Sequence, residues 1–486
     1  MSDKLKGLEP ERVFHYFEEI CRIPHGSGNE KAISDYCVAF AKSHGLWVRQ
    51  DEALNVVIRK PASPGYESAP VVMIQGHMDM VCEKNSDVTF DFEKDSLNLN
   101  IDGDFISASG TTLGGDDGIA VAYALAILED DRLSHPELEV VITTDEEVGM
   151  KGARHLDTSD LKAAYLLNLD NESEGQILTS CAGGMKSRAD IPVRRVEWEG
   201  IPGSIKISGL KGGHSGAEIH CGRANANRLM GRLLMCLNKE LNVGVIKVNG
   251  GMKDNAIPRE CEAAILIQPE DKERAEQICA DFSLDIHDEF HTSDPNIKIE
   301  LVIESNNIDK VDIFHPSDME RIIFMLVQSP NGIQTMSMEL PGLVESSLNL
   351  GILTTEEDHV RFSWAVRSSK KSLKYLISDQ LEYMTEFLGG HYWYEGEYPH
   401  WSFRSESPIR QVVCDAYREL FGKEARVEAI HAGLECGLIS EKMPELDMVA
   451  IGPDIFDIHT PDEHLSISSV ARTYDLIRTV LSRIVK

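Results

Sequence analysis

The sequence predicts an α/β fold: a mostly parallel sheet with flanking helices, plus an inserted α+β domain. Four short runs are almost continuously apolar, as in strands buried on both faces of a sheet, at 71–74, 138–142, 164–169 and 448–451. Helical stretches lie between these runs, and strands that alternate with helices are typical of parallel sheets. The long interval between the third and fourth runs predicts the insertion.

The elements follow in order along the chain. The clearest helix of the first part lies at 118–128, between the first two apolar runs. The long interval has its own alternation of strands and amphipathic helices. These are strands at 243–248, 263–267 and 297–303, and helices at 224–237 and 372–388. This interval is long enough to fold alone. We therefore expect one discontinuous domain at 1–185 and 396–486 and an inserted domain at 186–395. Two similar α/β halves would suit the insert, although its sequence shows no clear repeat.

Net charge and cysteine usage narrow the class of protein. A net charge of −32 disfavours binding to nucleic acid or anionic membranes, because both need a basic surface. No window approaches the roughly 20 apolar residues of a membrane span, and the N-terminal stretch lacks the apolar core of an export signal. The ten cysteines include no CxxC pair, which is typical of reduced thiols. We expect a cytoplasmic protein whose partners include neither nucleic acid nor membrane.

Residues that can bind metal ions follow the predicted strands. Ligands in open α/β sheets bind beyond the carboxyl ends of the strands. The residues at these ends and before the helix at 118–128 are His77 and Asp79, Asp116, Glu146 and Glu147, Asp170, and His459. Taken singly, each has an ordinary structural explanation, such as an N-cap for an aspartate at a helix start. Their expected convergence favours one shared site.

The residue types suit two metal ions. Zinc binds imidazole nitrogen and carboxylate oxygen, and two ions about 3.5–4 Å apart can stabilise a hydrolytic transition state. Two Zn²⁺ carry four positive charges, which Asp116, Glu147, Asp170 and one hydroxide would balance. Of Glu146 and Glu147, one would bind metal and the other would move a proton from water to the leaving amine. Asp79 shares a strand face with His77 and is placed to fix the tautomer of its imidazole.

These residues resemble the co-catalytic zinc family that includes aminoacylases, glutamate-type carboxypeptidases, succinyl-diaminopimelate desuccinylase and bacterial dipeptidases. Five further stretches are similar to its subfamily of Xaa-His dipeptidases. They are SGTTLG at 109–114, KGGHSG at 211–216, GRANAN at 222–227, DNAIPR at 254–259 and HTPDE at 459–463. The resemblance runs from residue 77 to 463 and so through both expected domains. It implies a zinc-peptidase domain at 1–185 and 396–486, and a lid or dimerisation domain at 186–395.

The resemblance also implies roles for the metal-binding residues. Asp116 would bridge two divalent ions, most naturally Zn²⁺ with Co²⁺ or Mn²⁺ as alternatives. His77 and Asp170 would bind one ion, and Glu147 and His459 the other. A water that bridges both ions would attack the peptide bond.

Two implied features concern the neighbours of these ligands. Glu146 would be the general base, and the peptide bond after Asp116 would be cis. Asn commonly follows the bridging aspartate in the subfamily, whereas this chain has Asp117, which adds a charge near the cluster.

In the inserted domain, the resemblance points to three residues that contact substrate. His214, in a glycine-flanked turn, would stabilise the developing oxyanion. Asn255 and Arg367 would hold the substrate, Arg367 through its C-terminal carboxylate. In the segment 396–486 of the discontinuous domain, the loop from Gly433 to Gly437 could add backbone N–H groups to that carboxylate. We expect the insert to close over the sheet, with His214 acting in cis or from a partner subunit of a homodimer formed through the lid.

The expected function is hydrolysis of dipeptides, chiefly Xaa-His including β-alanyl-histidine. An N-acyl amino-acid deacylase or a tripeptidase would use the same chemistry, and a silent homologue that only binds metal or peptide is the alternative from another class. The pair His287 and His291 superficially resembles HExxH, but the glutamate is one position late. We expect no metal there.

Overall fold

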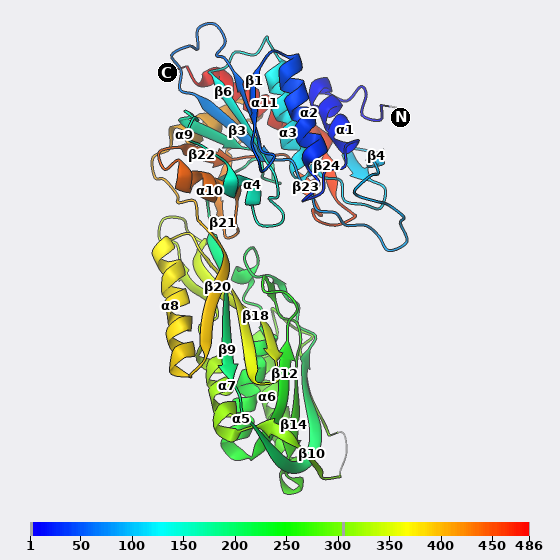
Figure 1. The fold of residues 1–486 in the computed structure, drawn as a ribbon, viewed down its shortest axis with the longest axis vertical. Coiled ribbons are helices and arrows are strands. Elements are labelled where there is room, and N and C mark those ends of the chain that lie inside the picture. The colour runs from blue at the N-terminus through cyan, green and yellow to red at the C-terminus, as the bar shows by residue number, and fades with distance from the viewer. Residues whose placement is uncertain (1–2, 304–306, 486) are drawn as a thin grey trace. The chain divides into compact units, whose positions relative to one another are not determined.

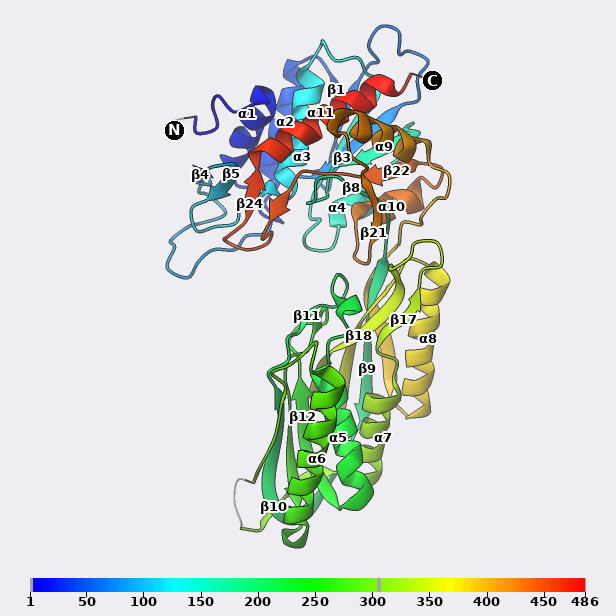
Figure 2. The same ribbon diagram turned by 180° about the vertical axis from the view of Figure 1, so that it is seen from behind.

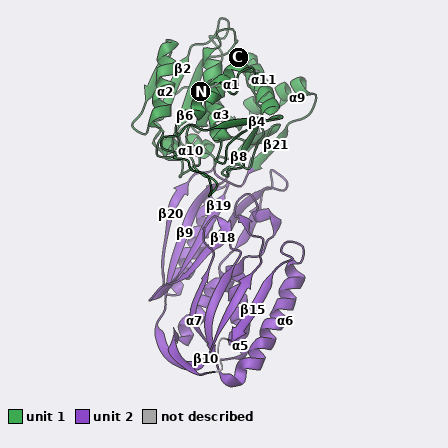
Figure 3. Ribbon diagram, turned by 90° about the vertical axis from the view of Figure 1, so that its right-hand side faces the viewer, with its two compact units in different colours: residues 1–181, 401–429, 434–486 green, residues 182–400, 430–433 purple. Residues whose placement is uncertain are grey.

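The computed structural model describes residues 3–303 and 307–485. The chain divides into two compact units (Figure 3). Unit 1 comprises residues 1–181, 401–429 and 434–486, and unit 2 comprises residues 182–400 and 430–433. The division falls a few residues from the expected boundaries. Residues 430–433 were expected in the discontinuous domain but group with unit 2, because the Ala182 N–H donates to the carbonyl oxygens of Ile430 and Ala432.

Unit 1 contains an eight-stranded sheet in its described part (Figure 1). In sheet order the strands are β1 (Trp47–Gln50), β2 (Val56–Lys60), β6 (Leu138–Thr143), β3 (Val72–His77), β7 (Tyr165–Asn168), β22 (Asp447–Ala450), β8 (Gln176–Cys181) and β21 (Arg426–Ile430). The central strands β6, β3, β7 and β22 are parallel, whereas β1, β2 and β8 pair antiparallel. The four central strands are the four predicted apolar runs, and the α/β prediction is confirmed.

Helices pack against this sheet and complete the core of unit 1. They are α1 (Glu11–Cys21), α2 (Lys31–Ser43), α3 (Gly115–Glu129), α4 (Lys151–His155), α9 (Pro408–Phe421), α10 (Glu435–Lys442) and α11 (Ile467–Arg483). Helix α3 is buried on every side from Gly115 to Leu128, as expected for an apolar helix inside a core. One hydrophobic cluster joins α1, α2, α3, α9 and α11 to the central strands. Figure 2 shows α9 and α11 side by side, and the two helices are in contact.

The strand register aligns the candidate ligands. His77 ends β3 opposite Thr143 of β6, so the loop with Glu146 and Glu147 begins beside it. Asp170 follows β7, the neighbour of β3 on its other side. A small sheet of β4 (Leu99–Asp102), β5 (Phe105–Ala108), β23 (Ile455–Phe456) and β24 (His464–Ser466) carries the loop that contains His459.

Unit 2 is built around a ten-stranded sheet in its described part. Its strands are β9 (Gly183–Pro192), β10 (Arg195–Ser208), β12 (Val243–Gly250), β14 (Cys261–Ile267), β15 (Lys298–Ile303), β16 (Asp309–Phe314), β17 (Gly332–Met336), β18 (Val344–Thr355), β19 (His359–Ser368) and β20 (His391–Tyr398). A separate pair is formed by β11 (Gly213–His214) and β13 (Ala256–Ile257). The helices are α5 (Ala226–Glu240), α6 (Lys272–Phe290), α7 (Pro316–Gln328) and α8 (Lys371–Phe387), and they share one core cluster with the sheet.

The sheet of unit 2 consists of two halves of the same topology. One half runs β10, α5, β12, β14, α6, β15 along the chain, and the other runs β9, α7, β18, β19, α8, β20. In both, the first strand lies between the third and the fourth, and β12 pairs with β18 to join the halves. The five elements predicted in the insert are confirmed. Its two similar halves, suggested above without a sequence repeat, are visible in the topology.

Two expectations from the sequence concern membrane spans and the state of the cysteines. Within residues 3–303 and 307–485, no helix combines the length and apolar character that a membrane span needs. All ten cysteines are free thiols.

Candidate metal centre

Asp116 connects two groups of potential metal ligands in unit 1. Its Oδ1 lies 3.2 Å from Nε2 of His77, whose Nε2 is also 3.8 Å from Oδ1 of Asp170. Its Oδ2 lies 3.2 Å from Nε2 of His459, which is 2.8 Å from Oε1 of Glu147. Within each group of three, the ligand atoms lie within 4.8 Å of one another. The five side chains thus form two donor sets that share one carboxylate.

His77 is held from behind by Asp79. The imidazole is 1% exposed, and its Nδ1 lies 3.0 Å from the backbone oxygen of Asp79 and 3.4 Å from the carboxylate Oδ1. A proton on Nδ1 would be donated to this backbone oxygen, which leaves Nε2 free to bind a cation. The expected orienting contact with Asp79 is present, but the shorter distance is to its main chain.

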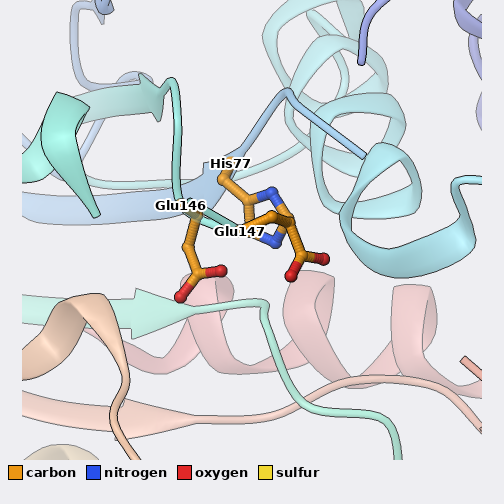
Figure 4. Close-up of side chains that lie close together, drawn as sticks. All are labelled: His77, Glu146 and Glu147. Atoms are coloured by element: carbon orange, nitrogen blue, oxygen red, sulfur yellow. The ribbon is translucent and has the colours of Figure 1, made fainter. Parts of the chain in front are cut away.

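The carboxylate of Asp79 mainly organises the loop after β6. Its Oδ1 accepts from the Glu146 N–H at 3.0 Å, and its Oδ2 accepts from the Glu147 N–H at 3.2 Å and from the Ser27 hydroxyl at 2.8 Å. Figure 4 shows the side chains of Glu146 and Glu147 beside the imidazole of His77. Asp79 therefore ties the candidate base and the candidate ligand to the strand that carries His77.

A second buried carboxylate supports the same loop. Glu30 is 4% exposed, and its Oε1 accepts from the Asp145 N–H at 3.1 Å. Asp145 has a φ of +52°, a left-handed conformation that is uncommon for residues other than glycine. The contact with Glu30 holds this turn immediately before Glu146.

Asp116 lies where helix α3 begins irregularly. Gly114 precedes it with a φ of +68°, and both Asp116 and Asp117 have non-helical dihedral angles. The Asp116–Asp117 peptide bond is cis, which confirms the prediction. Asp117 is 1% exposed, and its Oδ2 accepts from the His77 N–H at 3.1 Å. This carboxylate faces the main chain of β3.

His459 projects from the loop between β23 and β24. Its side chain is 44% exposed, and its φ is +61°. Hydrogen bonds to Asp116 and Glu147 raise its pKa to about 11. Burial alone would lower the pKa of His77, but hydrogen bonds to Asp116 and Asp79 raise it well above its usual value. The carboxylates thus stabilise a positive charge at both imidazoles. In the protein without metal a proton on each ring supplies this charge, and a metal ion bound to the neutral ring would replace that proton. The donor set suits divalent metal ions.

A buried glutamate that the sequence reading missed lies near these ligands. Glu435, in α10, is 0% exposed, and its Oε2 accepts from Gln75 at 2.6 Å and from Thr143 at 2.5 Å. Burial raises its pKa to about 7. Thr143 is the last residue of β6, and Gln75 lies two residues before His77 at the end of β3. In the sequence, this glutamate lies within GLECGL at 433–438, the stretch whose glycines predicted a loop.

In unit 2, His214 is oriented as a neutral hydrogen-bond donor. Its Nδ1 accepts from the N–H groups of Gly216 at 3.3 Å and Ala217 at 3.0 Å. Burial and the nearby guanidinium of Arg367 lower its pKa to about 4. A neutral ring whose Nδ1 accepts hydrogen bonds carries its proton on Nε2. That N–H is available to donate.

Arg367 lies beside His214 in the same unit. Its Nη2 is 3.4 Å from Nε2 of His214, and its Nη1 donates to the Tyr398 hydroxyl at 2.9 Å. The residue is 8% exposed, and its Nε meets no acceptor among the described residues. The Nε2–H of His214 and the guanidinium of Arg367 are therefore two neighbouring donors in unit 2. Such a pair suits an anionic oxygen.

The other two predicted substrate residues are placed less tightly. Asn255 is exposed and precedes β13, which pairs with β11 so that His214 lies opposite Ala256. Gly433 is half-buried in the segment that groups with unit 2. The expected loop from Gly433 to Gly437 is wrong, because α10 begins at Glu435 and the Gly437 N–H donates to the Leu434 carbonyl oxygen.

The histidine pair at the C-terminal end of α6 is structurally ordinary. Nδ1 of His287 contacts the Ser283 carbonyl oxygen, and Nδ1 of His291 contacts that of Asp288, each at 2.8 Å. Neither belongs to a candidate metal group among the described residues.

Known peptidases are similar to this chain in sequence and in fold. The profile described as peptidase family M20/M25/M40 matches residues 73–483. The chain is 38% identical over 486 residues to the cytosol non-specific dipeptidase of Escherichia coli (strain K12), with 99% of each chain covered. The crystal structure of aminoacylhistidine dipeptidase from Vibrio alginolyticus matches with a TM-score of 0.91 at 36% identity, covering 100% of this chain and 99% of that chain. A tripeptidase from Staphylococcus aureus shares the fold, with a TM-score of 0.57 at 16% identity over 98% of this chain and 99% of that chain.

Proposed function

The chain belongs to peptidase family M20/M25/M40, and on this premise we propose that it is a dipeptidase that uses two divalent metal ions. One structural observation carries the two-metal proposal. The two oxygens of Asp116 each contact a different imidazole, and each imidazole has a second carboxylate nearby. A single ion would leave one of these donor sets without a cation.

Five residues would hold the ions. His77 and Asp170 would bind one, Glu147 and His459 the other, and Asp116 both. Zn²⁺ is the natural occupant of imidazole and carboxylate ligands, with Co²⁺ or Mn²⁺ as alternatives. When bound, the ions lower the pKa of a water molecule and polarise the scissile carbonyl group.

Glu146 would act as the general base. It accepts a proton from the attacking water at its carboxylate and donates that proton to the nitrogen of the leaving amine as the C–N bond breaks. Its main chain is held by Asp79, and no hydrogen bond to its carboxylate is found within the described residues. The carboxylate is therefore free to exchange a proton with substrate.

Residues of unit 2 would contact the substrate. The Nε2–H of His214 would donate to the carbonyl oxygen as negative charge develops there. Arg367 would bind the C-terminal carboxylate, with Asn255 and the backbone at Gly433 as further contacts. Because Arg367 lies 3.4 Å from His214, the carboxylate it binds would belong to the residue directly after the scissile bond. This spacing favours dipeptides over longer peptides.

A substrate panel tests the proposed function. We expect Xaa-His dipeptides, including β-alanyl-histidine, to be hydrolysed with a kcat/KM about 10- to 100-fold above that of tripeptides, whose C-terminal carboxylate would lie beyond Arg367. The kcat/KM for Xaa-His dipeptides should also exceed that for N-acetyl amino acids. One lost hydrogen bond to a charged group costs about 1.5–3 kcal/mol. Turnover confined to tripeptides or N-acyl amino acids would replace the proposal with the corresponding activity. If protein that contains two measured ions per chain hydrolyses none of these substrates, the chain would be a homologue that only binds metal or peptide.

Replacing His214 with Ala tests its role in the reaction. We expect kcat to fall about 10²- to 10³-fold, as for other donors to a developing oxyanion, while two ions remain bound. The exposed neighbour His220 provides the control, and its Ala variant should retain the parental kcat. An unchanged kcat for the His214 variant would exclude this role.

Location and assembly are further proposals. The E. coli relative is a cytosol dipeptidase by name, and all ten cysteines here are free, which supports a cytoplasmic location. A homodimer through unit 2 is supported by exposed apolar side chains on α8, namely Leu376, Tyr383 and Phe387. Light scattering of the purified chain would give its oligomeric state.

A further inference from the structure

The carboxylate of Glu463 accepts four consecutive backbone N–H groups. Oε2 accepts from Leu113 at 2.7 Å and from Gly114 at 3.1 Å. Oε1 accepts from Gly115 at 2.8 Å and from Asp116 at 3.3 Å. Glu463 itself is 2% exposed. An ionised carboxylate has about four acceptor positions, and these bonds use all of them.

Leu113 and Gly114 precede α3, and Gly115 and Asp116 are its first two residues, so these N–H groups need an acceptor from outside the helix. The first N–H groups of a helix have no intrahelical partner and are usually capped by a preceding side chain. The residue before α3 is Gly114, which has no side chain and whose φ of +68° suits glycine. The irregular backbone at Asp116 and Asp117 further interrupts the helical hydrogen bonds. Glu463 supplies the missing cap from a distant part of the chain.

The cap comes from the loop that carries His459, the proposed ligand that contacts Asp116. Glu463 lies four positions after His459, and its N–H donates to the Thr460 carbonyl oxygen at 3.1 Å. The next residue, His464, begins β24, which pairs with β5. Glu463 therefore joins a fixed strand to the start of α3. His459, by contrast, is substantially exposed and has a positive φ.

We propose that Glu463 is a positioning residue of the metal centre. It fixes the main chain of Asp116 relative to the loop of His459, so that Oδ2 of Asp116 and Nε2 of His459 can bind the same ion. This inference rests on the proposed two-metal function. Glu463 is not itself a ligand or base, because both of its oxygens are occupied by N–H donors.

The variant Glu463→Gln tests the proposal in the full-length chain. Glutamine keeps the size of the side chain but replaces one oxygen with an NH₂ group, which cannot accept the two N–H bonds on that side. We expect the weaker of two Zn²⁺ binding steps to lose about 10- to 100-fold in affinity, as is typical when a residue that supports a metal ligand is replaced. Excess Zn²⁺ should restore most of kcat with KM unchanged. The absorption spectrum of the Co²⁺-loaded protein should also change.

Glu139→Gln is a matched control. Glu139 is 0% exposed and accepts from the N–H groups of Lys162 and Ala163 with both oxygens, but it lies at the opposite end of β6 from Glu147. A purely structural effect should lower the Tm of both variants and leave Zn²⁺ affinity unchanged in both. We expect reduced Zn²⁺ affinity only in Glu463→Gln.

The outcomes separate this inference from the proposed function. Parental Zn²⁺ affinity and Co²⁺ spectrum in Glu463→Gln, in a chain that binds two ions, would overturn the inference alone. A parental chain that binds fewer than two ions would overturn the proposed function and this inference with it. If Glu463→Gln does not fold, Glu463→Asp carries the test. Its carboxylate is one methylene shorter and cannot reach all four N–H groups, so parental Zn²⁺ affinity in that variant would also overturn the proposal.

Discussion

Replacing Glu146 with Gln is expected to lower kcat about 10²- to 10⁴-fold while the chain still binds two metal ions. General acid–base catalysis contributes about this much, and glutamine has no carboxylate to accept a proton. The main-chain bond from Glu146 to Asp79 does not depend on the side chain, so the loop should stay in place. Steady-state kinetics on a dipeptide, with elemental analysis of the same sample, provides the measurement.

Asp145→Asn is the matched control for this prediction. Asp145 precedes Glu146 on the same loop, and asparagine tolerates its φ of +52°. The control removes one carboxylate from the loop without touching the base, and we expect it to keep most of the activity. Equal losses in the two variants would mean that loop charge, rather than proton transfer by Glu146, explains the effect.

The parallel centre of the sheet could be predicted because strands that are buried on both faces have almost continuously apolar sequences. The runs that became β3, β6, β7 and β22 are apolar at nearly every position, and their ends indicated where ligands would gather. The antiparallel edge strands, and the pairing of β12 with β18, depend on which strands meet. Local sequence patterns do not encode this.

The ligands could be predicted because metal binding demands particular residue types, whereas their supports could not. Glu30, Glu435 and Glu463 act on main-chain N–H groups or on buried amide and hydroxyl groups. Any segment of chain offers such partners, so nothing local distinguishes these glutamates from surface ones. The same reason explains the grouping of residues 430–433 with unit 2, which depends on hydrogen bonds to Ala182.

Asp116→Asn should have the most severe effect on the metal centre itself. Asparagine retains one oxygen that can face an ion, but the other position becomes an NH₂ group that cannot bind a cation. The two oxygens of Asp116 lie 3.2 Å from His77 and 3.2 Å from His459, so the change removes the connection between the donor sets. It also removes one of three negative charges that balance two divalent ions.

We expect Asp116→Asn to lose one ion per chain under conditions that saturate the parental protein. The affinity for that ion should fall by more than about 100-fold, the upper end of the loss for residues that only support a ligand. Hydrolysis should fall with it. Asp117→Asn is the control at the next position: Asp117 is also buried, and an asparagine oxygen can still accept the His77 N–H. That variant should keep two ions. Two tightly bound ions in Asp116→Asn would mean that another residue bridges the pair, and Glu147, whose Oε1 already lies 2.8 Å from His459, would be the first residue to examine.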